Sequence, residues 1–217
     1  MFKGLRKDIA AVKERDPAAR GSLEVLLLNS GVHALIYYRI SHWFYAHSLF
    51  FIARAISQWA RFFTGIEIHP GAKIANGVLI DHGAGVVIGE TAEVGEGCTI
   101  YQGVTLGGNG KDKGKRHPTL GKNVMVGSGA KILGPFTVGD NAKIAAGAVV
   151  LEPIPEDATA VGVPARVVRR GNKKVPQDMD QIHIPDPVSQ ELCKLLMKIE
   201  ALEKRVNELE DKESNLL

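Results

Sequence analysis

The sequence predicts an α+β chain with three parts: an N-terminal helical region, a left-handed parallel β-helix and a C-terminal helical tail. A six-residue hydrophobic period through the middle of the chain predicts the β-helix, and a three- to four-residue spacing at both ends predicts the helices. A fixed short period is typical of a solenoid, in which each repeat packs on its neighbours. Alternating strands of a β-sandwich would instead show a period of two.

The six-residue period fills two kinds of inward position. The first series is Ile68, Ile74, Ile80, Val86, Ala92, Cys98 and Val104. A second position, two residues later, is filled by Ile88, Val94, Ile100 and Leu106. After an interruption the period resumes at Leu120, Val126, Ile132, Val138, Ile144 and Val150. Three such hexads make one triangular coil, and the glycines that follow several of them suit corners where the backbone turns sharply.

Residues 1–65 lack the six-residue period and are expected to form an N-terminal helical domain. Their apolar residues recur at three- to four-residue intervals, as in Ile36, Ile40, Trp43, Phe44, Ile52, Ile56 and Trp59. The Asp16-Pro17 step and Gly31 are expected to separate the helices, because proline restricts the residue before it and glycine weakens a helix.

The β-helix is expected to span residues 66–170, with one interruption. Residues 107–119 are too polar and too rich in glycine to form a coil, so we expect them to leave the β-helix as an extruded loop. Loops on rigid scaffolds often carry binding groups.

Residues 171–217 are expected to form a linker and an amphipathic helix. The linker contains Pro176, Pro185 and Pro187. The apolar residues that follow alternate by three and four, in an a/d heptad pattern made of Leu192, Leu195, Ile199, Leu202, Val206 and Leu209. Both a coiled coil between copies of the chain and a single helix packed on the body fit this pattern.

The composition narrows the class of protein. At 217 residues the chain suits one compact domain with appendages, and its net charge of +3 is too small to indicate nucleic-acid binding. Cys98 and Cys193 lie in different segments and do not suggest a disulfide framework. The aromatic stretch 49–63 carries Arg54 and Arg61 and is too short for a membrane span. We therefore expect a cytoplasmic protein without a nucleic-acid or membrane partner.

His82 is the chemical exception within the six-residue period. Asp81 precedes it, and Glu67 lies fifteen residues earlier, close to the length of one coil. A carboxylate stacked one coil away would hydrogen-bond one imidazole nitrogen and stabilise the imidazolium. The other nitrogen would then be free to take a proton from a hydroxyl group and return it to a leaving group.

Several short segments carry a resemblance to a known family. They are Arg15-Asp16-Pro17, residues 33–40, residues 67–74, residues 79–82, residues 87–91, residues 104–108, residues 115–118 and residues 162–166. In this order, over about residues 5–170, they resemble the serine O-acetyltransferases of the hexapeptide-repeat acyltransferase superfamily. The period alone indicates only the superfamily, whereas Asp16, His82 and Arg116-His117 together point to serine.

This resemblance implies transfer of the acetyl group of acetyl-CoA to the hydroxyl of L-serine, giving O-acetyl-L-serine and CoA, the first step of cysteine biosynthesis. It makes His82 the general base. Glu67 takes the place of the family's usual aspartate partner of that histidine and is one methylene longer. Asp16 and Asp81 would bind the serine ammonium.

The resemblance also assigns the residues near the extruded loop. Arg116 would hold the serine carboxylate, a task that suits a bidentate guanidinium, and His117 would hydrogen-bond the substrate and help to close the site. Backbone N–H groups near Gly107 and Gly108 would stabilise the oxyanion. Neither cysteine lies in a motif that activates a nucleophile, so direct transfer is expected.

The resemblance places the pantetheine arm of acetyl-CoA in the groove between neighbouring β-helices, along Ser128, Lys143 and Ala146. No metal is implied. His82 and His117 would then face each other across a subunit boundary, so a homotrimer is expected, and the short helical region argues against a hexamer. L-cysteine is expected to inhibit by occupying the serine site. Binding of cysteine synthase through the C-terminal end is left open, because the chain ends in Leu217 where the family usually has isoleucine.

Three alternatives compete with this interpretation. A γ-type carbonic anhydrase is built on the same β-helix and holds zinc with three histidines, and His69, His82 and His117 are available here. Such a site needs two histidines close in sequence, and none accompanies His117. A sugar acetyltransferase would keep the fold but would need no partner for an ammonium group. A scaffold role toward cysteine synthase would add to catalysis and not replace it.

Overall fold

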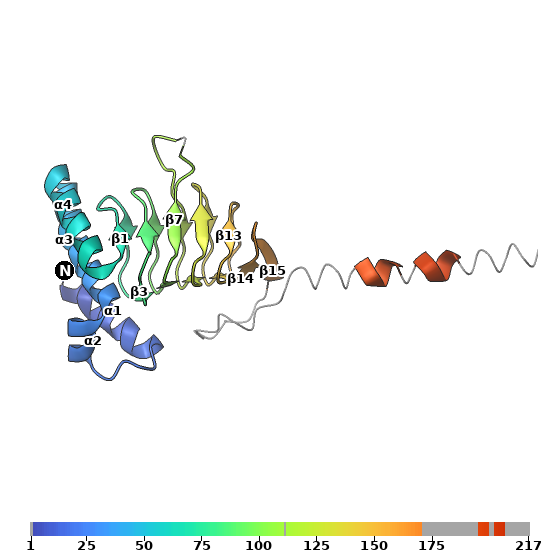
Figure 1. Cartoon of the computed structure of the whole chain (residues 1–217), viewed down its shortest axis with the longest axis horizontal. Coiled ribbons are helices and arrows are strands. Elements are labelled where there is room, and N and C mark those ends of the chain that lie inside the picture. Colours follow the sequence, from blue (N-terminus) through green and yellow to red (C-terminus); the bar gives the residue numbers. More distant parts are fainter. Residues whose placement is uncertain (1, 111, 171–194, 200–201, 207–217) are drawn as a thin grey trace, which may run out of the picture. The chain divides into compact units, whose positions relative to one another are not determined.

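The computed structural model describes residues 2–110, 112–170, 195–199 and 202–206, and the chain divides into two compact units, residues 1–183 and 184–217. The helical region forms as expected, ahead of the β-helix (Figure 1). Its helices are α1 (Phe2–Arg15), α2 (Ser22–Leu28), α3 (Ser30–Ala46) and α4 (Phe50–Thr64). None of the helices in the described part of the chain has the length and apolar character needed to cross a membrane.

The helices separate at the Asp16-Pro17 step, as predicted, but the prediction for Gly31 is wrong. The break lies at Asn29, whose side-chain Oδ1 accepts a hydrogen bond of 2.9 Å from the backbone N–H of Val32 and so caps α3. Gly31 lies buried in the first turn of α3 instead. A Cβ atom at this position would overlap the carbonyl oxygen of Ile80, so the glycine permits α3 to approach the β-helix closely.

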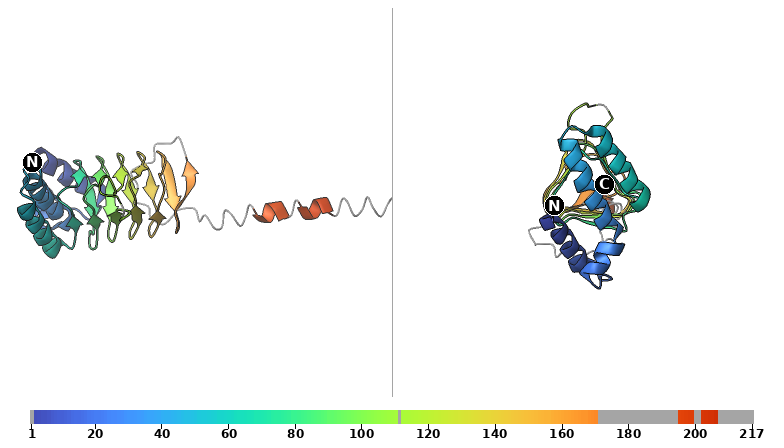
Figure 2. Two further views of the ribbon diagram at one scale, coloured as in Figure 1. Left: turned by 90° about the horizontal axis from the view of Figure 1, so that it is seen from above. Right: turned by 90° about the vertical axis from the view of Figure 1, so that its left-hand side faces the viewer.

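The middle of the chain forms the predicted parallel β-helix. Its first sheet runs in the order β1 (Glu67–Ile68), β4 (Val87–Ile88), β7 (Thr105–Gly107), β10 (Lys131–Leu133), β13 (Val149–Val150). The second sheet contains β2 (Lys73–Ile74), β5 (Glu93–Val94), β8 (Thr119–Leu120) and β11 (Thr137–Val138). The third contains β3 (Leu79–Asp81), β6 (Thr99–Tyr101), β9 (Met125–Val126), β12 (Lys143–Ile144), β14 (Ala158–Val161) and β15 (Arg166–Arg170). The end-on view in Figure 2 shows the three sheets as the sides of a triangle.

Two corners of this triangle matter for function. The chain turns from the first sheet to the second at residues 69–72, 89–92, 108–118 and 134–136, which we call the Arg116 corner. It turns from the third sheet back to the first at residues 82–86, 102–104, 127–130 and 145–148, which we call the His82 corner. The two corners therefore lie at opposite ends of the strands of the first sheet.

The register of the strands corrects the predicted hydrophobic series. Ile68 pairs with Ile88, twenty residues later, whereas Ile88 pairs with Leu106 after eighteen. Ile68, Ile74 and Ile80 therefore belong to the same inward series as Ile88, Val94 and Ile100, and the period slips by two residues after Ile80. The small inward series runs through Ile66, Ala72, Val78, Val86, Ala92, Cys98 and Val104, all buried. The slip falls at His82, so this residue lies outside the inward slot to which we had assigned it.

The helices cover the first coil through hydrogen bonds as well as apolar contacts. In α3, the hydroxyl of Tyr38 donates to the carbonyl of Ala72 at 2.7 Å and accepts from the backbone N–H of Ile74 at 3.0 Å. In α4, the hydroxyl of Ser57 donates to the carbonyl of Ile68 at 3.0 Å. These bonds occupy backbone groups at the start of the β-helix that would otherwise be left without partners.

In the second unit, residues 195–199 and 202–206 are helical and their apolar side chains are exposed. The heptad positions Leu192 and Leu209 and the predicted linker lie outside the described residues. The coiled coil and the domain boundary near residue 171 stay predictions.

Candidate active site

His82 occupies the His82 corner with its side chain in solvent. Its backbone has a φ of 56°, which is uncommon for a residue other than glycine, and its side chain is 76% exposed. Nε2 of His82 lies 3.9 Å from Oδ1 of Asp81, the last residue of β3. The two-residue slip thus turns the imidazole out of the β-helix, where a substrate can reach it.

Glu67 lies beside the same corner, because its backbone N–H donates to the carbonyl of Val86 at 2.9 Å. Its carboxylate does not face His82 in an ion pair here. Oε2 of Glu67 lies 3.1 Å from Nη1 of Arg61 in α4. The carboxylate next to His82 is that of Asp81, and the predicted Glu67–His82 pair requires the Glu67 side chain to turn away from Arg61.

Asp16 acts electrostatically on Asp81, although the two residues are far apart in the sequence. Burial raises the pKa of the half-buried Asp81; His82 counteracts this increase and the negative charge of Asp16 adds to it. Asp16 follows α1, and its Oδ1 accepts a hydrogen bond of 2.8 Å from the backbone N–H of Ala18. The negative charges of Asp81 and Asp16 make the surroundings of this corner attractive for a cation.

The side chain of Arg15 fixes the position of the neighbouring Asp16. The buried Arg15 guanidinium donates from Nη1 to the carbonyl of Gly97 at 2.8 Å, to the carbonyl of Cys98 at 3.3 Å and to Oγ1 of Thr99 at 3.2 Å. These bonds attach the C-terminal end of α1 to the β-helix next to the third sheet.

Arg116 and His117 end the extruded loop at the Arg116 corner. Nη2 of Arg116 lies 2.5 Å from Oε2 of Glu90, whose Oε1 accepts a hydrogen bond of 3.0 Å from the hydroxyl of Tyr45 in α3. The hydrogen bond from Arg116 lowers the pKa of Glu90 against the effect of burial. The guanidinium is therefore held in place, with its charge partly balanced.

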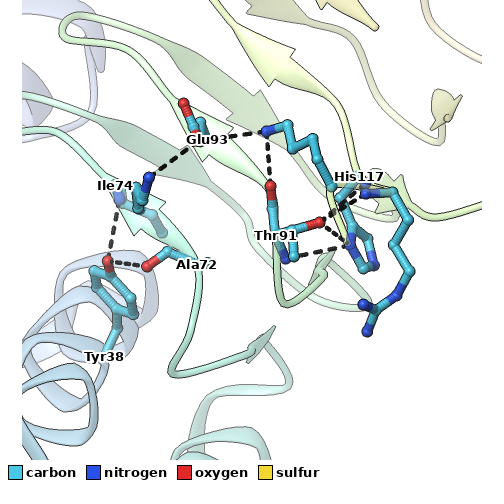
Figure 3. A network of polar contacts seen from close by, with 9 residues as sticks. Tyr38, Ala72, Ile74, Thr91, Glu93 and His117 are labelled. Carbon is cyan, nitrogen blue, oxygen red and sulfur yellow. Dashed lines mark hydrogen bonds and ion pairs between the residues drawn. The ribbon is translucent and has the colours of Figure 1, made fainter. Parts of the chain in front are cut away.

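His117 lies against Gly89. Its ring also contacts Thr91, as Figure 3 shows. A Cβ atom at Gly89 would overlap the imidazole, so the glycine makes room for the ring. Burial and the charges of Arg116 and Lys115 lower the pKa of His117, and Glu90 opposes this. The ring is therefore held in a defined position, in surroundings that disfavour its charged form.

The residues predicted to bind acetyl-CoA divide between the two corners. Gly107 ends β7 and Gly108 begins the Arg116 corner, where a Cβ atom at Gly108 would come within 3.1 Å of the Arg116 side chain. Ser128 and Ala146 lie at the His82 corner on successive coils, where the backbone N–H of Gly147 donates to the carbonyl of Ser128 at 2.8 Å. Lys143 lies on β12 of the third sheet.

The structure therefore places Asp81 and His82 beside one corner, where the charge of Asp16 also acts, and Arg116 and His117 at another. In the described ranges, no group of three or more His, Cys, Asp or Glu side chains is placed to hold a metal ion. The roles of Arg15, Tyr45, Glu90 and Thr91 were missed by the sequence analysis. Glu90-Thr91 stood in a segment quoted for the family resemblance, but no chemistry in the sequence marked these residues.

Comparison with known proteins fits this arrangement. Residues 1–36 match the family model "Serine acetyltransferase, N-terminal", and residues 117–152 match "Bacterial transferase hexapeptide (six repeats)". The serine acetyltransferase of Bacillus licheniformis is 52% identical over 209 residues, covering 96% of this chain and 97% of that protein.

Solved structures agree in fold as well as in sequence. A serine acetyltransferase in complex with cysteine is 44% identical with a TM-score of 0.82, covering 84% of this chain and 72% of that one. A serine acetyltransferase in complex with CoA is also 44% identical, with a TM-score of 0.74, covering 77% of this chain and 69% of that one. The chain therefore belongs to the serine acetyltransferases of the hexapeptide-repeat acyltransferases.

Proposed function

We propose that this chain transfers the acetyl group of acetyl-CoA to L-serine by direct attack of the serine hydroxyl, with His82 as the general base. The distribution of charge is the observation that supports this most strongly. Asp81 lies beside His82, the negative charge of Asp16 acts on Asp81, and the guanidinium of Arg116 lies at the other end of the strands of the first sheet. This pairing suits the ammonium and carboxylate of an amino acid, whereas a sugar carries neither charge.

In the proposed reaction, His82 takes the proton of the serine hydroxyl as its oxygen attacks the thioester carbonyl carbon. The carbon–sulfur bond then breaks, and the proton on His82 passes to the departing CoA thiolate. Backbone N–H groups near Gly107 and Gly108 stabilise the negative charge on the carbonyl oxygen. A covalent acetyl-cysteine intermediate is disfavoured at Cys98, because burial raises the pKa of this thiol to about 12.

We further propose that the site is shared between subunits of a homotrimer. His82 and Arg116 lie at opposite ends of the strands of the first sheet in one chain. One molecule of serine therefore cannot bridge them within that chain. If the first sheets of three copies face a common axis, the His82 corner of each copy meets the Arg116 corner of its neighbour. The groove between the two corners would then hold the pantetheine arm along Ser128 and Ala146, with Lys143 nearby.

Inhibition by L-cysteine follows from the same site, because cysteine carries the same ammonium and carboxylate groups as serine. The related structure in complex with cysteine supports this. A cytoplasmic location fits the use of acetyl-CoA. Binding of cysteine synthase by the C-terminal end stays a prediction, since residues 207–217 lie outside the described part of the chain.

The first experiment is an acetyl-transfer assay that follows loss of the thioester absorbance of acetyl-CoA, since a thiol assay would also detect L-cysteine. We expect L-serine to drive the reaction, and L-cysteine to suppress it competitively with L-serine. A panel of sugars serves as the alternative acceptors. Transfer to a sugar alone would reject the roles of Asp16, Asp81 and Arg116. If no acceptor is acetylated, a separate assay that shows zinc-dependent hydration of carbon dioxide would favour the carbonic anhydrase alternative.

The shared site has its own test. His82→Ala and Arg116→Ala homotrimers should each be nearly inactive. Trimers assembled from an equal mixture should regain activity, because about one quarter of their interfaces pair an intact His82 corner with an intact Arg116 corner. The control is a mixture of His82→Ala with the double variant His82→Ala/Arg116→Ala, which forms no intact site. Absence of recovery in the first mixture, with mixed trimers shown by mass spectrometry, would place each site within one chain.

A further inference from the structure

The side chain of Thr91 forms the centre of a hydrogen-bond network that holds the end of the extruded loop. Its Oγ1 lies 3.0 Å from the backbone nitrogen of Arg116, 3.1 Å from that of His117 and 2.9 Å from the ring Nδ1 of His117. The backbone carbonyl of Thr91 accepts a further bond of 2.7 Å from Nζ of Lys115. Figure 3 shows Thr91 beside the His117 ring. Three successive loop residues are thus attached to one threonine.

The direction of each bond determines where the proton of His117 lies. Both backbone N–H groups can only donate, so Oγ1 of Thr91 uses its lone pairs to accept from them. Its own hydroxyl proton is then free to point at Nδ1 of His117. The backbone N–H of Thr91 points at the same Nδ1, at 3.2 Å. Two donors converge on Nδ1, so this nitrogen must carry a lone pair and the ring proton must sit on Nε2.

We infer that Thr91 is a positioning residue that fixes His117 as a neutral imidazole with its proton on Nε2, so that His117 serves as a hydrogen-bond donor and not as a base. This inference rests on the proposed function, in which the Nε2–H group of His117 donates to an oxygen atom of a bound substrate. It divides the chemistry between the two histidines. His82 is exposed and can accept a proton, whereas His117 can only donate a hydrogen bond in the orientation that Thr91 and Gly89 impose.

The surroundings of His117 also favour the neutral imidazole over the imidazolium form. Burial and the positive charges of Arg116 and Lys115 oppose the imidazolium form, whereas Glu90 favours it. The pKa of His69 is likewise lowered, by burial and by the charges of Arg54 and Arg116, against the effect of Glu90. Protonation of Nδ1 would in addition turn the two donors from Thr91 into repulsive partners.

The direct test is nitrogen NMR of the full-length protein labelled in its histidines, with the His117 signal assigned by its loss in His117→Gln. We expect Nδ1 to show the shift of a bare ring nitrogen, and Nε2 that of a protonated one. Thr91→Val keeps the shape of the side chain but removes the hydroxyl. It should let His117 become protonated at higher pH, while Thr91→Ser should behave as the wild type does.

Activity provides the second readout. Thr91→Val should lower kcat/KM by about 2–10-fold, the effect of one neutral hydrogen bond, because His117 loses its fixed orientation. Thr91→Ser should restore kcat/KM. Thr137→Val is the matched control, since Thr137 is an exposed threonine on the second sheet.

A proton found on Nδ1 in the wild type would overturn the inference, as would identical titration of His117 in the wild type and Thr91→Val. The NMR result needs no substrate, so it separates failure of this inference from failure of the proposed function.

Discussion

Asp81 and His82 are consecutive residues, and Oδ1 of Asp81 lies 3.9 Å from Nε2 of His82. Consecutive residues of a strand point to opposite faces of a sheet, so this pair cannot form within a regular strand. It forms here because β3 ends at Asp81 and the backbone of His82 takes a positive φ. The contact is thus a direct product of the two-residue slip in the repeat.

Removal of the imidazole tests the general base. We expect His82→Ala to reduce kcat by about 10²–10⁴-fold, the usual contribution of a positioned base, with little loss of folded protein because the side chain is exposed in the single chain. Steady-state kinetics with both substrates measures this, and size-exclusion chromatography checks assembly. Near-normal turnover by a correctly assembled variant would exclude His82 as the base.

Glu67 is the second target, because its carboxylate pairs with Arg61 and not with His82 in the free protein. If Glu67 turns to His82 during the reaction, Glu67→Gln should lower kcat by about 10–100-fold, the effect of one hydrogen bond to a charged group. The control is Arg61→Gln, which removes the competing partner and should leave kcat unchanged or higher. Normal kcat in Glu67→Gln would leave Asp81 as the carboxylate that supports His82.

The pH dependence of serine binding tests the paired carboxylates. Burial raises the pKa of Asp81, and the negative charge of Asp16 adds to this increase. As the pH falls through this raised pKa, Asp81 loses its charge and no longer attracts an ammonium group. We therefore expect KM for L-serine to increase toward acidic pH, while KM for acetyl-CoA stays level.

The variant Asp16→Asn sharpens this prediction. It removes the charge that raises the pKa of Asp81, so the acidic increase in KM should begin at lower pH, although KM is higher throughout. The profile of KM against pH for the two proteins measures the difference. An increase that begins at the same pH in both would mean that Asp16 does not act on Asp81.

Arg15 should control serine binding without touching serine. Arg15→Met removes the three hydrogen bonds that attach the end of α1 to the β-helix, so Asp16 loses its fixed position. We expect a several-fold increase in KM for L-serine, no change in KM for acetyl-CoA, and a loss of about 1–3 kcal/mol in the free energy of unfolding. Lys13→Met, an exposed residue of the same helix, is the control for the lost charge. Equal KM values in all three proteins would contradict the role given to Arg15.

The β-helix could be predicted because its signal is repeated on every coil. Each inward position from Ile68 to Val150 reports the same environment, so the pattern survives local errors such as the mistaken series between Ile80 and Val86. The position of His82 was harder to predict. A slip of two residues leaves the apolar residues six apart on either side. The pairing of Ile80 with Ile100, twenty residues later, shows that the extra residues lie after Ile80.

The family resemblance identified the residues of the candidate site but not the contacts between them. Asp16 and Asp81 are near each other because Arg15 attaches α1 to Gly97, a contact between parts of the chain that no local pattern records. In the same way, the bond between Glu90 and Arg116 and the position of Thr91 depend on how the extruded loop returns to the β-helix. Gly31 shows the opposite error, since a residue that often interrupts helices serves here for close packing.

The slip after Ile80 also bears on how such a chain could change over time. Deletion of His82 and Gly83 would bring Ile80 and Ile88 into an unbroken six-residue spacing, and the shortened corner would match those of the later coils. The product would be a more regular solenoid without the histidine that we propose as the proton acceptor. On that proposal, drift toward the simplest repeat would preserve the architecture and remove the general base.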